Sequence, residues 1–373
     1  MPPLTVMIKP ASSLCNLRCT YCFYADVAAR RESASFGVME QDTLETLVRR
    51  AFAYAEGHLS FMFQGGEPTL AGKAFFRSFL ALQRRYKTSR VVVHNAIQTN
   101  GYALDEQWCE IFREGQFLVG ISVDGTKALH DACRVTAGGE PTYDRIQKNI
   151  SMLREAGVEY NILCVVNEYI ARQPREVFES LKQHGFLQFI PCLDDFDGVK
   201  GEHSLCADTY GRFLIETFDL YEKAFRAGRP VSIRTFDNWL TMLLGYPPEN
   251  CGMAGRCGNY YLIEANGNAY PCDFYVLDKW LVGNIKEDSF FRMDKSAVSR
   301  TFREESIPLP PACKACPWLH LCRGGCKRDR EPVIGGVPSL NRLCAGHKAF
   351  FEARYERMRA LATCVAQQRK ASR

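Results

Sequence analysis

Cys15-Asn16-Leu17-Arg18-Cys19-Thr20-Tyr21-Cys22 follows the first apolar run of the chain, residues 5–9, which is typical of a buried β-strand. Three thiolates on one short loop can hold three corners of a [4Fe-4S] cluster, which normally takes four cysteines, and they leave one iron without a protein ligand. An open metal position is a place where a small molecule can bind and react. The alternative interpretation of this spacing is a chance group of cysteines or part of a zinc site.

Around this loop, β-branched or aromatic runs alternate with helical patterns, which is typical of repeated βα units and a parallel sheet. We expect strands at residues 5–9, 59–63, 91–97, 117–122, 160–166 and 189–193, and helices at residues 42–55, 71–85, 105–114, 143–156 and 174–184. Asp42 and Glu45 predict a capping pair for the first of these helices. Six βα units indicate an α/β fold with a partial (β/α)6 TIM-type barrel, in which reactive groups lie on loops after the strands.

The pattern changes twice further along the chain. We expect a barrel over residues 1–195, a helical connector over 196–250, a cysteine-rich domain over 251–348, and a C-terminal helix and tail over 349–373. Residues 209–227 and 237–244 predict the connector helices, and residues 345–362 predict the last helix, followed by a frayed polar tail. The cysteine-rich segment predicts one hairpin, at residues 260–263 and 269–271, that turns at Asn266-Gly267. Its few periodic apolar residues suggest that metal ligation supplies the missing folding free energy.

Cysteine is the unusual part of the composition. The chain has 17 cysteines in 373 residues, too few for a disulfide scaffold, which exceeds about 8% cysteine. We find no secretory signal and no run of about 18 apolar residues, so we expect no membrane span and a reducing cytoplasm. Clustered thiols in that compartment are usually metal ligands or catalysts. The net charge is +5, and the basic residues are scattered along the chain rather than grouped in blocks, which argues against a nucleic-acid surface.

The C-terminal third holds eight further cysteines, enough for two four-cysteine sites. Such sites suit zinc or [4Fe-4S] clusters, and the spacing alone does not separate these metals. The members are Cys251, Cys257, Cys272, Cys313, Cys316, Cys322, Cys326 and Cys344.

The second strand is followed by Gln64-Gly65-Gly66-Glu67-Pro68. Paired glycines let backbone approach a ligand closely, and Glu67 or nearby carbonyl groups can accept hydrogen bonds from an ammonium group. Together with the cysteine loop, this element resembles the radical S-adenosylmethionine (SAM) enzymes. The resemblance implies that Cys15, Cys19 and Cys22 hold a cluster whose open iron binds the methionine part of SAM. It also implies the cofactor contacts Tyr21, Gly65, Gly66, Glu67, Ser122, Arg134 and Leu193; taken singly, these residues are equally typical of ordinary packing.

The spacing Cys313-x2-Cys316-x5-Cys322-x3-Cys326 resembles the SPASM extension of radical enzymes that modify peptides. By that resemblance, one auxiliary [4Fe-4S] cluster is held by Cys251, Cys257, Cys272 and Cys326. The other is held by Cys313, Cys316, Cys322 and Cys344. The resemblance therefore implies three [4Fe-4S] clusters in all.

Residues 270–285 and the opening residues 8–13 resemble the anaerobic sulfatase-maturating enzymes specifically. This resemblance implies oxidation of an active-site Cys or Ser of an unfolded sulfatase, within a Cys/Ser-x-Pro-x-Arg motif, to Cα-formylglycine. It further implies a reductant such as flavodoxin or ferredoxin, and no nucleic-acid or membrane partner. Asp273 adjoins the predicted ligand Cys272, and the resemblance assigns it the catalytic base role; a nearby negative cluster would raise its proton affinity.

Two other functions are compatible with the same pattern. One is a different peptide maturase, for example one that forms thioether crosslinks, and the other is a non-enzymatic metal-binding module. Asp194, Asp195 and Asp237 are considered as acceptors for a substrate arginine, but solvated turns are the more typical place for such residues, and we do not include them in the predicted site.

Overall fold

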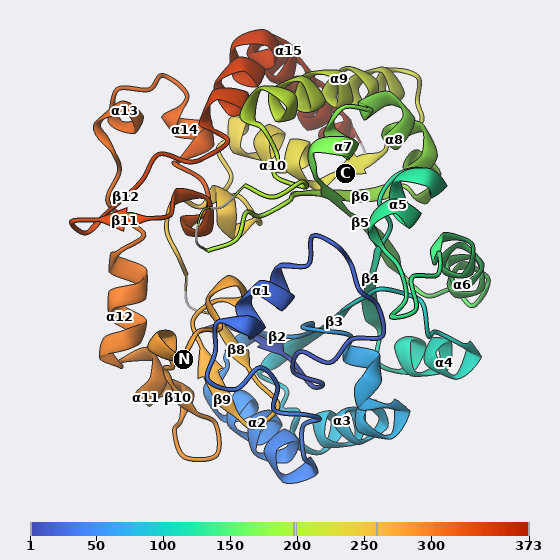
Figure 1. Cartoon of the computed structure of the whole chain (residues 1–373), viewed down its shortest axis with the longest axis vertical. Helices are drawn as coiled ribbons and strands as arrows, with labels where there is room; N and C mark the ends of the chain where they lie inside the picture. The colour runs from blue at the N-terminus through green and yellow to red at the C-terminus, as the bar shows by residue number, and fades with distance from the viewer. Residues whose placement is uncertain (1, 197, 199, 259, 372–373) are drawn as a thin grey trace. The chain divides into compact units, whose positions relative to one another are not determined.

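The computed structural model describes residues 2–196, 198, 200–258 and 260–371 (Figure 1). Packing divides the chain into two compact units, each assembled from separate segments. Unit 1 comprises Met1–Val123, His130–Asn161 and Asn259–Phe302, and unit 2 comprises Asp124–Leu129, Ile162–Gly258 and Arg303–Arg373. The predicted domain boundaries after residues 195, 250 and 348 stay predictions. No helix in the described part of the chain is long and apolar enough to cross a membrane.

Unit 1 is built on a sheet whose long strands are parallel. Its strands β1 (Leu4–Ile8), β2 (Gly57–Phe63), β3 (Val91–Thr99) and β4 (Phe117–Ser122) follow one another in this order. The register sets Ile8 beside Phe63 and Phe63 beside Ile97, so buried apolar side chains lie level across the sheet. The predicted α/β fold with a mostly parallel sheet is confirmed, and the predicted strands overlap the observed ones.

The predicted hairpin extends this sheet on the other side of β1. β8 (Tyr261–Ile263) pairs parallel with β1, and β9 (Asn268–Tyr270) pairs antiparallel with β8 and with β10 (Gly283–Asn284). Gly267 has φ of +91°, which the left-handed turn after Asn266 requires. The predicted turn is therefore confirmed, and a segment distant in sequence is placed beside the first strand.

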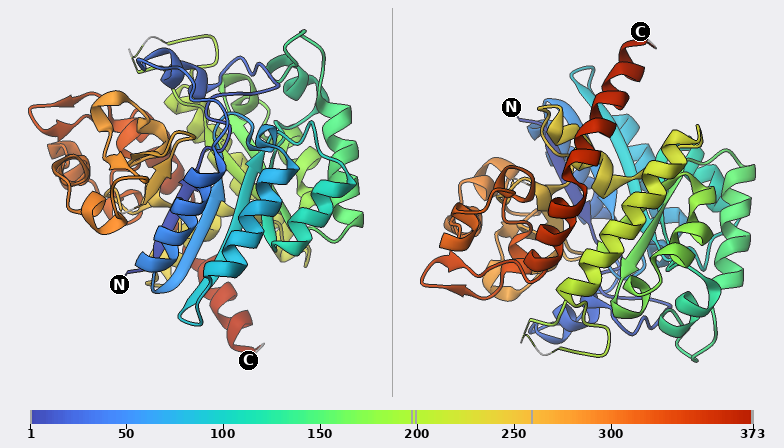
Figure 2. Two further views of the ribbon diagram at one scale, coloured as in Figure 1. Left: turned by 90° about the horizontal axis from the view of Figure 1, so that it is seen from below. Right: turned by 90° about the horizontal axis from the view of Figure 1, so that it is seen from above.

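Several helices and 3-10 helices belong to unit 1, and Figure 2 shows those of residues 41–54 and 73–86 in blue over the strands. The helices of this unit are α1 (Phe23–Ala29), α2 (Gln41–Tyr54), η1 (Pro68–Ala71), α3 (Lys73–Tyr86), α4 (Glu106–Glu114), α5 (Lys127–Cys133), α6 (Tyr143–Glu155), η4 (Asp273–Tyr275), η5 (Asp278–Trp280), α11 (Phe290–Asp294) and α12 (Ala297–Glu304), of which α5 and α12 run on into unit 2. The predicted capping pair of α2 is wrong, because the N-cap residue is Glu40. Asp42 instead pairs with Lys286 at 3.1 Å, and Glu45 accepts a hydrogen bond from Tyr86.

Unit 2 contains most of β5 (Tyr160–Val166), followed by β6 (Phe186–Pro191) and β7 (Ser232–Ile233), which pair in parallel. Its other elements are α7 (Glu168–Ala171), α8 (Pro174–Leu181), η2 (Lys182–His184), α9 (Ala207–Arg226), α10 (Arg234–Leu243), η3 (Cys251–Met253), α13 (Pro311–Lys314), α14 (Leu319–Cys322), η6 (Lys327–Arg330), β11 (Val333–Ile334), β12 (Val337–Pro338) and α15 (Cys344–Ala371). The predicted end of the last helix at residue 362 is wrong. The helix continues to Ala371 because no glycine or proline follows Gly346 and the tail is rich in helix-forming residues. Residues 372–373 of the predicted tail lie outside the described residues.

The core of unit 2 forms where α9, α10 and α15 pack together, as Figure 2 shows for α9 and α15. Aromatic rings fill this contact: the centroids of Trp239 and Phe350 are 5.0 Å apart. At one end the backbones approach so closely that a Cβ on Gly346 would lie 2.3 Å from the carbonyl oxygen of Ala207. Glycine at this position is therefore a packing requirement.

We expect Gly346→Ala to destabilise the protein by about 1–3 kcal/mol, the usual range for overpacking. Helix propensity alone predicts the opposite sign, a stabilisation of up to about 1 kcal/mol. Urea unfolding measures the difference. Gly201→Ala is the matched control, because a Cβ there meets no atom within 4 Å; an unfolding midpoint of Gly346→Ala at or above that of the parent protein would contradict the close approach.

Candidate active site

The three N-terminal cysteines lie on the loop between β1 and α1, at the carboxyl end of β1. Backbone hydrogen bonds hold this loop: Arg18 N–H donates to the Val135 carbonyl at 2.7 Å, and Thr20 N–H donates to the Cys133 carbonyl at 3.0 Å. Cys15, Cys19 and Cys22 are all half-buried. The loop therefore presents three thiols where a barrel fold carries its reactive groups.

The Gly65-Gly66 pair packs against this loop. Gly66 N–H donates to the Ser12 carbonyl at 3.0 Å, and Glu67 N–H donates to the Leu14 carbonyl at 2.7 Å. A Cβ on Gly66 would lie only 2.1 Å from the Leu14 oxygen. The glycines thus let the end of β2 touch the cysteine loop, and their contact with a ligand's amino group stays a prediction.

Glu67 is buried, and its carboxylate has four donors within unit 1. Oε1 accepts hydrogen bonds from Thr69 N, Thr69 Oγ1 and Thr99 Oγ1, and Oε2 accepts one from Asn100 N at 2.8 Å. Burial raises the pKa of Glu67, and these hydrogen bonds counteract the rise. The carboxylate ties the ends of β2 and β3 together, so its predicted ammonium contact stays a prediction.

Hydrogen-bond donors surround the thiols of the loop. Leu17 N and Asn100 Nδ2 approach the Cys15 sulfur at 3.4 and 3.8 Å. Arg134 Nη1 lies 3.8 Å from the Cys19 sulfur. Iron-bound thiolates are negative and accept hydrogen bonds, so this donor set fits an iron–sulfur cluster.

The other predicted cofactor residues divide between the units. Arg134 stacks over Tyr21, with its guanidinium carbon 5.4 Å from the ring centroid, so unit 1 brings these two residues to Cys19. Ser122 is buried at the end of β4 in unit 1, and Leu193 follows β6 in unit 2. Their cofactor roles stay predictions.

Asp273 lies in a polar pocket of unit 1. Its Oδ2 accepts hydrogen bonds from Tyr24 Oη and Gln64 Nε2, both at 2.8 Å, and Gln64 also donates to Tyr24 at 2.6 Å. Its Oδ1 is buried and has no hydrogen-bond partner among the described residues. Burial raises the pKa of Asp273 to about 6, against the opposing positive charge of Lys9. One carboxylate oxygen is therefore fixed, and the other is available as an acceptor.

A buried charge cluster lies beside this pocket. Lys9 Nζ is 3.0 Å and Arg31 Nη1 is 2.7 Å from Glu264 Oε1, and all three side chains are almost fully buried. The pairing of β1 with β8 creates the cluster, because Lys9 and Glu264 follow the paired residues Ile8 and Ile263. Two cations against one carboxylate leave excess positive charge near Asp273.

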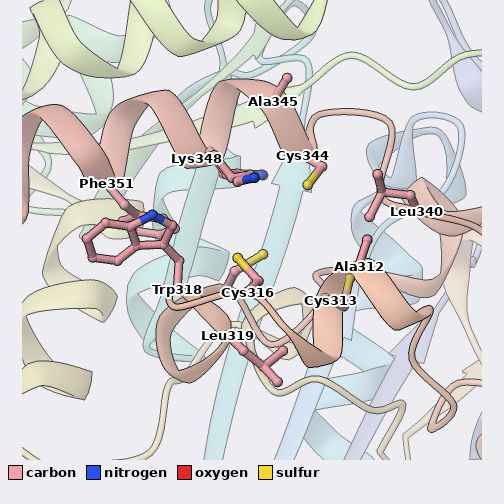
Figure 3. Close-up of a pocket in the computed structure, with 13 residues that line it drawn as sticks. Ala312, Cys313, Cys316, Trp318, Leu319, Leu340, Cys344, Ala345, Lys348 and Phe351 are labelled. Carbon is pink, nitrogen blue, oxygen red and sulfur yellow. The ribbon is translucent and has the colours of Figure 1, made fainter.

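The thiols of the second predicted auxiliary set, Cys313, Cys316, Cys322 and Cys344, line one cavity of about 250 Å³ in unit 2. Figure 3 shows the sulfur atoms of Cys316 and Cys344 facing each other across it. Trp318 also lines the cavity, and its indole nitrogen is buried with no hydrogen-bond partner among the described residues. One zinc ion, with Zn–S bonds of about 2.3 Å, would leave such a space unfilled. The cavity fits a polyatomic cluster with sulfide acceptors.

Three members of the first predicted auxiliary set, Cys251, Cys257 and Cys326, belong to unit 2, and Cys272 belongs to unit 1. Burial raises the pKa of Cys326 well above its ordinary value, and the negative charges of Cys251 and Cys257 add to the rise. That mutual repulsion indicates three thiols that would ionise together only around a positively charged core. Their ligand roles, like those of the other cysteines, stay predictions.

All 17 cysteines lie in the described residues, and none forms a disulfide. In this part of the chain, no three His, Cys, Asp or Glu side chains are grouped so as to hold a single metal ion. The six cysteines outside the predicted sets are mostly buried: Cys109, Cys133, Cys164 and Cys192 are buried, Cys364 is half-buried, and Cys206 is exposed.

The sequence analysis missed Tyr24, Asn100 and Lys9. Asn100 could have been found, because it lies three residues after the predicted strand 91–97, at the edge where reactive groups gather. Tyr24 and Lys9 carry no local signal. Of the acidic residues considered for a substrate arginine, Asp237 accepts hydrogen bonds from the hydroxyl groups of Tyr221 and Ser232. Asp194 forms an ion pair with Arg342 at 3.5 Å.

Two family matches cover much of the chain. Residues 10–181 match the Radical SAM superfamily. Residues 251–317 match SPASM, an iron-sulfur cluster-binding domain.

Relatives match almost from end to end. The chain is 45% identical over 370 residues to a cysteine-type anaerobic sulfatase-maturating enzyme of Clostridium novyi (strain NT), covering 98% of this chain and 99% of the relative. It is 32% identical to a serine-type enzyme of Bacteroides thetaiotaomicron, covering 94% of this chain and 89% of the relative. The solved structure of native anSMEcpe with bound AdoMet and Cp18Cys peptide is 40% identical, with a TM-score of 0.93, covering 98% of this chain and 100% of that chain. This chain therefore belongs to the anaerobic sulfatase-maturating enzymes, radical SAM enzymes with a SPASM domain.

Proposed function

We propose that this protein oxidises an active-site cysteine of a sulfatase polypeptide to Cα-formylglycine in a SAM-dependent reaction. The similarity to sulfatase-maturating relatives supports this reaction. The identity to the cysteine-type relative, 45%, exceeds that to the serine-type relative, 32%, which supports cysteine as the preferred residue. The related structure with AdoMet and a peptide supports a peptide segment as the substrate.

The chain's thiols would hold three [4Fe-4S] clusters. Cys15, Cys19 and Cys22 would hold the SAM-binding cluster, and the two four-cysteine sets would hold the auxiliary ones. When bound, these groups and SAM would supply a 5′-deoxyadenosyl radical that removes a hydrogen atom from the substrate Cβ, and would take up the electron that the substrate then loses. Water then replaces the sulfur of the resulting thioaldehyde, and the sulfur leaves as hydrogen sulfide. The protein's own task is to place the substrate and to accept one proton.

The free Oδ1 of Asp273 is the observation that carries this proposal. Tyr24 and Gln64 hold Oδ2, so Oδ1 is left as a buried acceptor of fixed direction. With a pKa of about 6 the carboxylate is ionised at neutral pH, yet it is basic enough to take a proton. Asp273 therefore accepts the proton that leaves the substrate.

The finer identity of the partners rests on the resemblance to the sulfatase-maturating enzymes. The substrate segment that this resemblance implies is a Cys-x-Pro-x-Arg motif in an unfolded sulfatase. A one-electron protein reductant such as flavodoxin or ferredoxin supplies the electron that starts each turnover.

We expect anaerobic incubation with SAM and a reductant to convert a Cys-x-Pro-x-Arg peptide to a hydrazine-reactive aldehyde faster than the matched Ser-x-Pro-x-Arg peptide. Mass spectrometry of both peptides measures reaction and residue preference together. A thioether crosslink in place of the aldehyde would indicate a different maturase. Absence of SAM cleavage would indicate a non-enzymatic module.

We expect the reconstituted protein to bind about 12 iron atoms per chain, four for each cluster. Cys344→Ala removes one wall of the cavity in Figure 3 and is expected to lower the count to about eight. Cys109→Ala, at a buried thiol outside the predicted sets, should leave it unchanged. About four irons with two zinc ions would show instead that the C-terminal sites are structural.

We expect Asp273→Asn to retain SAM cleavage but to lower aldehyde formation by about 10²–10⁴-fold, the usual contribution of a general base. Asparagine preserves the size of the side chain and removes its proton affinity. Asp278→Asn is the matched control, because Asp278 lies on the neighbouring turn and accepts from Glu32 N. An unchanged aldehyde yield in Asp273→Asn would refute the base assignment.

A further inference from the structure

Arg330 in unit 2 is a fully buried cation without a carboxylate partner among the described residues. Its Nη2 donates to the Ser306 carbonyl at 2.8 Å. Its Nε and Nη1 are buried and have no hydrogen-bond partner in the described part of the chain. A buried charge that lacks both a counter-ion and hydrogen bonds is strongly destabilising, so a native chain keeps one only where something else compensates it.

The side chain lies between loops that carry predicted cluster ligands. Ser306, which accepts Nη2–H, also receives the N–H of Cys257 on its Oγ at 2.8 Å. On another side, Gly324 lies between Cys322 and Cys326 in sequence, and a Cβ there would come within 3.5 Å of Arg330 Nη1. The guanidinium therefore contacts the Ser306 carbonyl beside Cys257 and lies near the segment between Cys322 and Cys326, which contribute to the second and the first predicted auxiliary set respectively.

Other cations of the same segment are already partnered. Lys327, on the same 3-10 helix and equally buried, pairs with Glu305 at 2.9 Å. Arg342 pairs with Asp329 at 2.9 Å. Arg330 is thus distinguished from its neighbours by its two unused donors.

We propose that Arg330 is a positioning residue shared by the two auxiliary iron–sulfur clusters, to which it supplies a buried counter-charge and N–H donors for their sulfur atoms. This inference rests on the proposed cofactor content. A four-thiolate [4Fe-4S] site has a net charge of about −2 when oxidised and gains a further negative charge on reduction. A nearby cation and hydrogen bonds to sulfur stabilise the reduced form more than the oxidised form. Arg330 therefore raises the reduction potentials of both clusters.

The test is an EPR-monitored redox titration of the full-length chain. A background in which Cys15, Cys19 and Cys22 are replaced by alanine would carry the auxiliary clusters alone. In Arg330→Met, both auxiliary potentials are expected to become more negative. Arg330→Lys keeps the charge but loses the guanidinium fork, so it should shift them less.

Lys327→Met is the matched control, because it removes a buried cation that already has a carboxylate partner. Because Glu305 already neutralises this cation, its removal should not shift both auxiliary potentials together. Auxiliary potentials in Arg330→Met equal to those of the parent protein would overturn the proposal.

A measurement without any substitution covers the case in which these variants fail to fold. The protein is labelled with arginine carrying ¹⁵N in its guanidinium group, and pulsed EPR of the reduced auxiliary clusters should show ¹⁵N hyperfine coupling. Absence of that coupling at both clusters would overturn the proposal. Twelve bound irons with no coupling would refute this inference alone, whereas only about four bound irons would refute the proposed cofactor content itself.

Discussion

The backbone contact between Gly66 and the Ser12–Leu14 turn is the constraint on which the site in unit 1 depends. With the Leu14 oxygen 2.1 Å from where a Cβ would be, only glycine allows the end of β2 to touch the cysteine loop. That contact fixes the backbone position of Glu67, whose carboxylate accepts a hydrogen bond from Asn100 N. The side-chain amide of Asn100 in turn donates to the Cys15 sulfur. Because Gly66 has no side chain, the residues that follow β2 and β3 can reach the first cysteine of the loop.

A second theme is the compensation of buried charge. Beside Asp273, Lys9 and Arg31 face the single carboxylate of Glu264, and the charge of Lys9 counteracts the rise in the pKa of Asp273 that burial causes. Around the predicted auxiliary sites, Arg330 lacks a carboxylate among the described residues, and negative sulfur would supply what is missing. Both arrangements place positive charge in the interior close to a group that carries negative charge, the Asp273 carboxylate in one case and the sulfur atoms of the proposed clusters in the other.

Some unpaired buried atoms lie beside the predicted cluster and substrate groups. Asp273 Oδ1, Trp318 Nε1 and two nitrogens of Arg330 lack partners among the described residues. An unpaired buried donor or acceptor costs about 1–3 kcal/mol. Bound ligands at these places would complete the hydrogen bonding of these atoms.

The sequence by itself determined the βα order, most helix and strand positions and the Asn266-Gly267 turn, because periodicity and turn chemistry are local properties. It misjudged the capping pair of α2, where Asp42 pairs with Lys286, and the end of α15, which helix propensity extends to Ala371. Only the tertiary structure decided the surroundings of Asp273. Tyr24 and Gln64 reach it across 249 and 209 residues of chain, and Lys9 meets Glu264 because β8 pairs with β1. Such meetings depend on which strands become neighbours, and no short stretch of sequence encodes that choice.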